Sequence, residues 1–386
     1  MGHAIMLPDP DGTLSPHQVG EPAPYPRRSA PPRTRTVYAA AHVVADPRFC
    51  SATERAVLDI DATLAFRHHL WDLGMFVAEA MDTAQRGMGL DWPAARDLIS
   101  RTGAEATGRG ARWCAGAQTD HLAPGSARNL DEVIGAYLEQ CEVVEAAGAT
   151  VVVMASRELC RVAAGPEDYA SVYRAVLSQL SRPAILHWLG AAFDPGLAGY
   201  WGSTTYEAAA ASFLGIVAEH AERIQGVKCS LLEQQKEVEL RQQLPNGVAM
   251  YTGDDFDYPT TIAGDGTRHS DALLGAFDFA APAAAHACAA LDAGDLVGFH
   301  ERIAPSLPLA RHVFCAPTSY YKTGVVFLAY LNGFQAHFKM VGGLESGRSL
   351  VHLAECFRLA DGAGLLADPE LAVARMQGLL GAANVV

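Results

Sequence analysis

Short apolar runs alternate with longer amphipathic segments along most of the chain. The apolar runs are rich in small and β-branched residues, and each is short enough to be a buried strand. They lie at residues 37–44, 75–80, 112–118, 149–155, 184–189, 226–230, 248–252 and 272–278. Because strands that alternate with helical segments form parallel sheets, the pattern predicts eight βα units.

The segments between these runs are long enough to be crossover helices, for example residues 130–147, 166–180, 206–223 and 232–244. Eight such units predict a (β/α)8 TIM barrel, whose active site lies at the carboxyl ends of the strands. A doubly wound open sheet is the alternative fold. Against this alternative, no strand is followed by a Gly-x-Gly-x-x-Gly turn that would hold a dinucleotide, and no Gly-x-x-x-x-Gly-Lys-[Ser/Thr] loop is present. No cofactor is predicted.

The two ends of the chain differ from the repeating centre. Residues 1–34 contain eight prolines among Gly, Ser, Arg and Asp, and we expect this segment to stay extended or disordered. The barrel then spans residues 35–295. Residues 296–386 are predicted to form a helical extension packed on the barrel, with helices near residues 323–339 and 369–380.

Composition excludes several classes of protein. The formal charge of −14 and the lack of a dense Lys/Arg run argue against nucleic acid and anionic membranes as partners. No uninterrupted apolar stretch of about 18 residues and no secretion signal is visible, so we expect a cytoplasmic protein. The eight cysteines are scattered, without a Cys-x-x-Cys pair or a zinc-finger-type Cys/His cluster, and are expected to be reduced.

One lysine, Lys228, lies in the apolar run at residues 226–230. A lysine removed from water has a lowered pKa and is partly neutral, as an amine that attacks carbonyl groups must be. The alternative is that its stem packs in the core while its ammonium group reaches the surface.

Other polar residues end or follow the strands, where a barrel has its active site. His187 and Trp188 end the fifth strand, Asp254 and Asp255 follow the seventh, and Asp278 ends the eighth. Each also has a structural interpretation: His187 as a core histidine, Asp254 or Asp255 as a helix N-cap, and Asp278 as a loop or cap residue. The pattern alone leaves both interpretations open.

Four of these segments resemble one known family. Residues 114–119, 183–187, 226–230 and 250–255 are similar to strand motifs of the dihydrodipicolinate synthase/N-acetylneuraminate lyase family, in order over about residues 110–330. The resemblance implies a (β/α)8 barrel with a C-terminal helical region and a homodimer or homotetramer. It also implies a class I mechanism in which Lys228 forms a Schiff base with a 2-keto acid.

The chain departs from the family pattern at three places. His187 stands where the family has a tyrosine proton relay, and Asp82 lies in the segment that replaces the family's Gly-Thr-Thr-Gly-Glu carboxylate-binding loop. Arg157 lies where the family has Tyr-Tyr, and it is a candidate for binding an anionic group. The predicted substrate-binding residues are Asp82, Gln118, Arg157, Trp188, Asp254, Asp255 and Asp278.

Three functions remain open from the sequence. The leading hypothesis is a Schiff-base lyase, aldolase or dehydratase without metal or cofactor, with Lys228 as nucleophile and His187 as acid/base. The second is a metal-dependent barrel lyase or isomerase with ligands among His42, Asp82, His187 and Asp254. The third is a non-catalytic barrel that binds a small molecule, suggested by the loss of the family's tyrosine and carboxylate loop.

Overall fold

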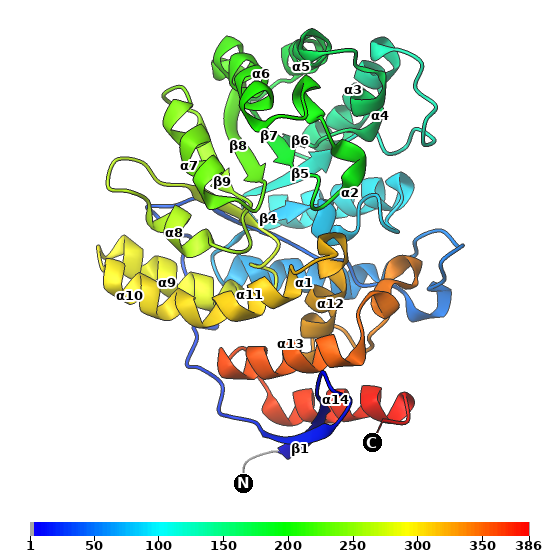
Figure 1. Cartoon of the computed structure of the whole chain (residues 1–386), viewed down its shortest axis with the longest axis vertical. Helices are drawn as coiled ribbons and strands as arrows, with labels where there is room; N and C mark the ends of the chain where they lie inside the picture. The colour runs from blue at the N-terminus through cyan, green and yellow to red at the C-terminus, as the bar shows by residue number, and fades with distance from the viewer. Residues whose placement is uncertain (1–3, 386) are drawn as a thin grey trace.

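The computed structural model describes residues 4–385, and its centre is a closed barrel of eight parallel strands (Figure 1). These strands are β3 (Val37–Ala40), β4 (Phe76–Glu79), β5 (Trp113–Ala117), β6 (Thr150–Val153), β7 (Ala184–Leu189), β8 (Ile224–Ser230), β9 (Ala249–Thr252) and β10 (Asp271–Leu274). They pair in chain order, and β10 closes the ring against β3. The predicted (β/α)8 barrel is therefore confirmed, and the open doubly wound sheet is wrong.

Side chains alternate between the barrel interior and the surrounding helices, because successive residues of a strand face opposite sides. Tyr38, Phe76 and Tyr251 belong to the inner cluster, with ring centroids 5.5 to 5.8 Å apart. Gly226 leaves room for this layer, since a Cβ there would lie 2.5 Å from the Tyr251 ring. The interior below Lys228 is thus a packed core rather than a channel.

Helices surround the barrel and connect its strands. They are α1 (Ile60–Asp72), α2 (Trp92–Arg109), α3 (Leu130–Ala146), α4 (Arg157–Val162), α5 (Pro166–Gln179), α6 (Tyr206–Glu219), α7 (Gln234–Gln243), α8 (Tyr258–Ala263) and α9 (Ala281–Asp292). Several begin at a side-chain cap: Asp59, Asp91 and Asn129 accept backbone N–H groups from the first turns of α1, α2 and α3.

The remaining helices form an extension next to the barrel (Figure 1). They are α10 (Leu296–Ile303), α11 (Leu307–Val313), α12 (Tyr321–Leu331), α13 (Leu350–Gly362) and α14 (Pro369–Ala382). The helix predicted at residues 323–339 ends early, because Asn332 caps it and Gly333 follows with φ +84°. None of the helices in residues 4–385 is long and apolar enough to cross a membrane.

The N-terminal segment is more ordered than its composition predicts. β1 (Ala4–Pro8) and β2 (Leu14–Gln18) pair as an antiparallel hairpin. Leu7 is fully buried, and Arg358 on α13 donates to Asp9 at 2.7 Å. The sequence predicts that residues 1–34 are extended or disordered, and a disordered state is wrong for residues 4–18, because contacts with α13 supply the stabilisation that this hairpin lacks by itself. Residues 19–34 contain no regular helix or strand.

Candidate active site

Lys228 lies inside the barrel on β8, with His187 on β7 and Tyr251 on β9 as its neighbours in register. Only 7% of the residue is exposed, so its ammonium group does not extend into open solvent. Gly253 lies directly against its stem, since a Cβ at that position would be 3.0 Å from Lys228 Cε. The strand and this close approach of the backbone together fix the lysine in the barrel interior.

Burial lowers the pKa of Lys228, while the carboxylates of Asp82 and Asp255 act in the opposite direction. Among residues 4–385, no hydrogen bond or ion pair reaches Lys228 Nζ. An amine of this kind is more often neutral than a surface lysine, and no partner has to be displaced before its lone pair can attack a carbonyl carbon.

His187 is completely buried beside this lysine, but it is bonded to a different residue. Its Nε2 atom is hydrogen-bonded to Ser230 Oγ at 3.1 Å, and its Nδ1 atom has no partner among the described residues. Burial, together with the Lys228 charge, holds the pKa of His187 well below its ordinary value. The imidazole is therefore neutral, and its role as acid/base remains a prediction.

The two carboxylates after β9 differ in their partners. Asp254 Oδ1 accepts the backbone N–H of Phe256, so this residue caps a turn, while Oδ2 is buried without a partner among residues 4–385. Asp255 accepts the N–H of Ala276 at 2.7 Å. Burial raises the pKa of Asp255 to about 7, although the Lys228 charge opposes this. Asp255 is thus a carboxyl group near Lys228 that changes charge near neutral pH.

Asp278 is occupied by a structural contact. It accepts both the backbone N–H of His42 at 2.7 Å and the Nδ1–H of the same residue at 2.8 Å, and both side chains are buried. This pair joins the ends of β10 and β3. The hypothetical metal ligands His42, Asp82, His187 and Asp254 do not form a ligand cluster in the described part of the chain.

A cavity of about 320 Å³ lies over the segments that follow β4 to β7. The predicted residues Asp82, Gln118 and Arg157 line it. Arg157 is paired with Asp194 at 2.6 Å, whereas Asp82 Oδ2 and Gln118 Oε1 are buried without partners among residues 4–385. Lys228 and His187 are not among the lining residues of this cavity. The cavity therefore does not reach the lysine itself.

Trp188 does not belong to the site, and its assignment to substrate binding is wrong. Its ring lies 5.2 Å from Phe213 on α6 and 6.1 Å from Trp201, between the barrel and the helices. His187 faces the interior, so the next residue on the same strand must face outward.

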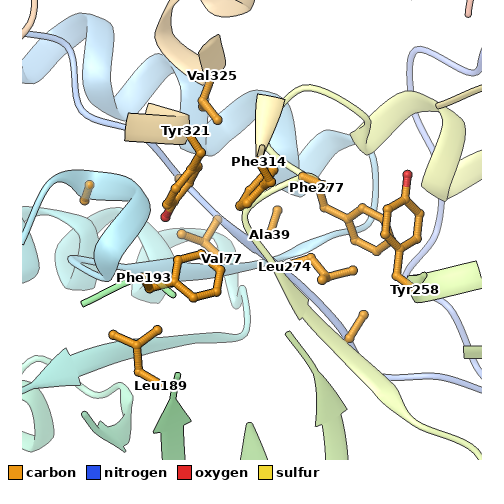
Figure 2. Packing of buried hydrophobic residues seen from close by; sticks show 14 of the residues in the cluster. Ala39, Val77, Leu189, Phe193, Tyr258, Leu274, Phe277, Phe314, Tyr321 and Val325 are labelled. Atoms are coloured by element: carbon orange, nitrogen blue, oxygen red, sulfur yellow. The ribbon is translucent and has the colours of Figure 1, made fainter. Parts of the chain in front are cut away.

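The C-terminal helices add groups that the sequence did not predict. Figure 2 shows Tyr321 and Phe314 next to each other, above Phe193 and Leu189. The rings of Phe314 and Tyr321 stack at 4.2 Å, and the Tyr321 hydroxyl is hydrogen-bonded to Thr83 at 2.9 Å. These aromatic rings cover the carboxyl end of the barrel.

Lys322 on α12 is the second buried lysine of the site. It is 4% exposed, lines the cavity, and donates from Nζ to the carbonyl of Ser319 at 3.1 Å. Burial lowers its pKa to about 8, although the charges of Asp82 and Asp194 oppose this. Lys322 lies beside an apolar run and Lys228 lies in one, so the sequence offers a similar kind of signal for both lysines. The place of Lys322 in the site could not be predicted, because α12 docks on the barrel mouth through long-range contacts.

The fold and its lysine define the class: a (β/α)8 barrel with the architecture of the dihydrodipicolinate synthases, carrying a buried lysine on its sixth barrel strand. Within that architecture, the chain belongs to a family described as "protein of unknown function (DUF993)", whose model matches residues 5–385. No curated protein matches the sequence.

Solved structures confirm the predicted resemblance at the level of the fold. Dihydrodipicolinate synthase from Thermotoga maritima is 16% identical, with a TM-score of 0.63 over 86% of this chain and 99% of that one. The enzyme from Aquifex aeolicus is 13% identical, with a TM-score of 0.61 over 91% and 98%. A prophage protein of the same family from E. coli K12, solved in complex with pyruvate, is 15% identical, with a TM-score of 0.62 over 91% and 99%.

Proposed function

We propose that this protein is a Schiff-base-forming lyase or aldolase, or a related dehydratase, that acts on a 2-keto acid or a similar carbonyl compound. Lys228 is the nucleophile. The observation that carries the proposal is the burial of this amine inside the barrel with no partner on Nζ among residues 4–385 and with a lowered pKa. A buried cation without a partner costs folding free energy, so a functional reason is needed to keep it.

The chemistry follows from a neutral amine. Lys228 Nζ adds to the carbonyl carbon, and loss of water from the carbinolamine leaves an imine. The protonated imine accepts the electron pair of an adjacent carbon–carbon bond as that bond breaks, while a base takes the hydroxyl proton of the departing carbonyl fragment. Protonation of the enamine carbon and hydrolysis of the imine return the lysine. The reverse sequence joins two fragments, and departure of a hydroxyl group as water gives dehydration.

Two groups are suited to the proton transfers. Asp255 changes charge near pH 7, because its pKa is raised to about 7, and its charge interacts with that of Lys228. His187 is neutral, and its Nδ1 atom has no partner among residues 4–385, so the ring is suited to accepting or relaying a proton during the reaction. Ser230 bonded to His187 Nε2 fixes the orientation of the ring.

Lys322 supplies the carboxylate contact that the missing glycine-rich loop provides in the resembled family. Most of the charged groups that line the cavity are paired, for example Arg157 with Asp194 and Arg86 with Asp120. Within the described chain, the hydrogen bond of Lys322 Nζ is to a backbone carbonyl alone. Its remaining N–H groups are therefore available to a substrate carboxylate.

A second candidate is a non-catalytic barrel that binds a small molecule. The aromatic rings of Phe193, Phe314 and Tyr321 over the strand ends favour it, as does the absence of Lys228 from the cavity lining. Binding of a carbonyl compound without covalent capture on any lysine distinguishes this candidate from the lyase.

The test is reduction with borohydride in the presence of pyruvate, 2-oxobutyrate or glycolaldehyde, followed by peptide mass mapping. We expect a stable adduct on Lys228. Lys228→Ala should lose the adduct, and Lys236→Ala, which removes a half-buried lysine paired with Glu233, should keep it.

Capture on Lys322 in place of Lys228, or equal labelling of Lys228→Ala and the native protein, would contradict the proposal. We also infer a homodimer or homotetramer by analogy with the resembled family, and light scattering on the purified protein tests it. A single monomeric mass would remove that inference without affecting the chemistry of Lys228.

A further inference from the structure

A second group of reactive side chains lies in the helical extension, apart from Lys228. His312 is in the last turn of α11, and His352 and Cys356 lie on α13, four residues apart and hence on one face of the helix. Figure 1 shows α11 and α13 next to each other. One ligand atom from each of the three residues lies within 4.8 Å of the other two.

The hydrogen bonds of the two histidines leave ring nitrogens free. The Nε2–H of His312 donates to the backbone carbonyl of His352 at 3.0 Å, which makes Nδ1 the nitrogen with the lone pair. The Nε2 atom of His352 is buried without a partner among residues 4–385. A second-shell bond from one ring nitrogen to a carbonyl is the arrangement that orients metal-binding histidines.

Neither histidine forms an ion pair with a carboxylate among residues 4–385. His17, His42 and His68 each lie within hydrogen-bond distance of an acidic side chain. The rings of His312 and His352 instead stack at 4.1 Å, with 21° between their planes. Two imidazoles packed against each other, with the buried His352 Nε2 atom lacking a partner among residues 4–385, have unused capacity as ligands.

Thiols complete the group. Cys356 is fully buried, and burial, with a smaller contribution from nearby Cys315, raises the pKa of its thiol. Cys315 is half-buried and lies three residues after His312. The two candidate ligand pairs are therefore His312-x-x-Cys315 and His352-x-x-x-Cys356. The packing of α11 on α13 brings His312 next to His352 and Cys356, and Cys315 lies outside this group of three.

The positive charge of a neighbouring arginine favours a site in which two cysteine thiolates bind the metal. The Arg348 guanidinium lies near the group and donates to the carbonyls of Cys315 and Pro317, so an additional unbalanced dication would be repelled. Two thiolates neutralise a divalent ion, and their two protons leave to solvent when the ion binds.

We propose that His312, Cys315, His352 and Cys356 bind a divalent transition metal that joins α11 to α13. Two nitrogen and two sulfur ligands suit tetrahedral zinc. Bonds of about 2.0–2.3 Å require ligand atoms about 3.5 Å apart. The ligand atoms of His312, His352 and Cys356 lie within 4.8 Å of one another, so small side-chain rotations bring these three to that separation, whereas Cys315 lies outside this group and has to turn toward it to supply the fourth ligand.

The site would stabilise the cover of the barrel. Phe314 follows directly after α11, between His312 and Cys315, and its ring stacks on Tyr321 at 4.2 Å. A metal at the end of α11 would therefore hold Phe314 in place, without contact to Lys228. This role is structural and does not depend on the proposed lyase activity.

The experiment uses the full chain stripped of metal by a chelator and titrated with Co²⁺ and then Zn²⁺. We expect stoichiometric binding, a thiolate-to-cobalt charge-transfer absorption band, its loss when Zn²⁺ displaces Co²⁺, and a higher melting temperature with Zn²⁺. Cys356→Ser and His312→Ala should each weaken binding at least tenfold and remove or reduce the band. His312 is half-buried, so its substitution is the milder one for folding.

The matched control is Cys288→Ser, which makes the same chemical change at a buried cysteine on α9. It should retain the cobalt spectrum. The proposal is wrong if the native protein gives no thiolate–cobalt band, or if folded Cys356→Ser and His312→Ala both keep it undiminished.

Discussion

Arg67 and Lys228 are both buried cations of the barrel, but their surroundings are opposite. Arg67 on α1 is completely buried and donates to both carboxylate oxygens of Glu79, at 2.7 and 2.9 Å. Glu79 also accepts from the Thr102 hydroxyl and from its neighbour's backbone N–H. Burial by itself raises the pKa of Glu79. The Arg67 charge and these hydrogen bonds outweigh burial and bring that pKa below its ordinary value.

Lys228 has none of these partners within the described chain, and burial lowers its pKa. The Arg67–Glu79 pair gives the outer face of β4 a fixed ion pair, whereas the inward face of β8 carries an amine with no such partner among residues 4–385. Complete pairing thus indicates a structural role for a buried charge, and incomplete pairing indicates a site for a ligand.

The largest expected effect comes from breaking the structural pair. Glu79→Gln keeps the shape of the side chain but leaves the Arg67 charge buried and uncompensated. We expect a loss of about 3–5 kcal/mol in the free energy of unfolding. Urea denaturation followed by circular dichroism measures this loss.

Lys228→Met is the contrasting variant. Because it removes a buried charge that has no partner, the free energy of unfolding should stay within about 1 kcal/mol of the native value or increase. A loss as large as that of Glu79→Gln would mean that Lys228 is a structural cation like Arg67, and the contrast between the two regions would fail.

The barrel itself could be predicted from the sequence, because each strand is a local run with a clear apolar pattern. β7 has the predicted bounds, and the predicted fifth and sixth strands place His187 and Lys228 as neighbours in register. Trp188 was misassigned because the prediction followed its position at the strand end and ignored the alternation of side chains along a strand.

Long-range contacts account for what the sequence could not indicate. The N-terminal hairpin has Pro8 and Pro16 in its strands, and it is ordered by contacts with α13, more than 300 residues away along the chain. Tyr321 and Lys322 reach the barrel mouth only through the docking of α12. No local pattern reports such docking.

Lys322 offers an intermediate test of the comparison, since it has one hydrogen bond, to a backbone carbonyl. If its free N–H groups bind a substrate carboxylate, Lys322→Met should raise the pyruvate concentration for half-maximal capture on Lys228 about tenfold, equivalent to about 1.4 kcal/mol. Capture of glycolaldehyde, which has no carboxylate, serves as the control and should not change. An equal effect on both compounds would assign Lys322 to the structure of the site instead.

The smallest expected effect is a shift in the pH dependence of capture on Lys228, caused by a change in the charges around its amine. If Lys228 forms the proposed imine, the rate of its capture should rise with pH through the lowered pKa of this lysine, because only the neutral amine attacks. Asp82 is the largest opposing influence, since its carboxylate stabilises the ammonium form. Asp82→Asn should therefore move the midpoint of the capture rate to lower pH, whereas Asp61→Asn, an exposed change on α1, should leave it unmoved. A shift to higher pH would mean that the Asp82 charge does not act on Lys228 in this way.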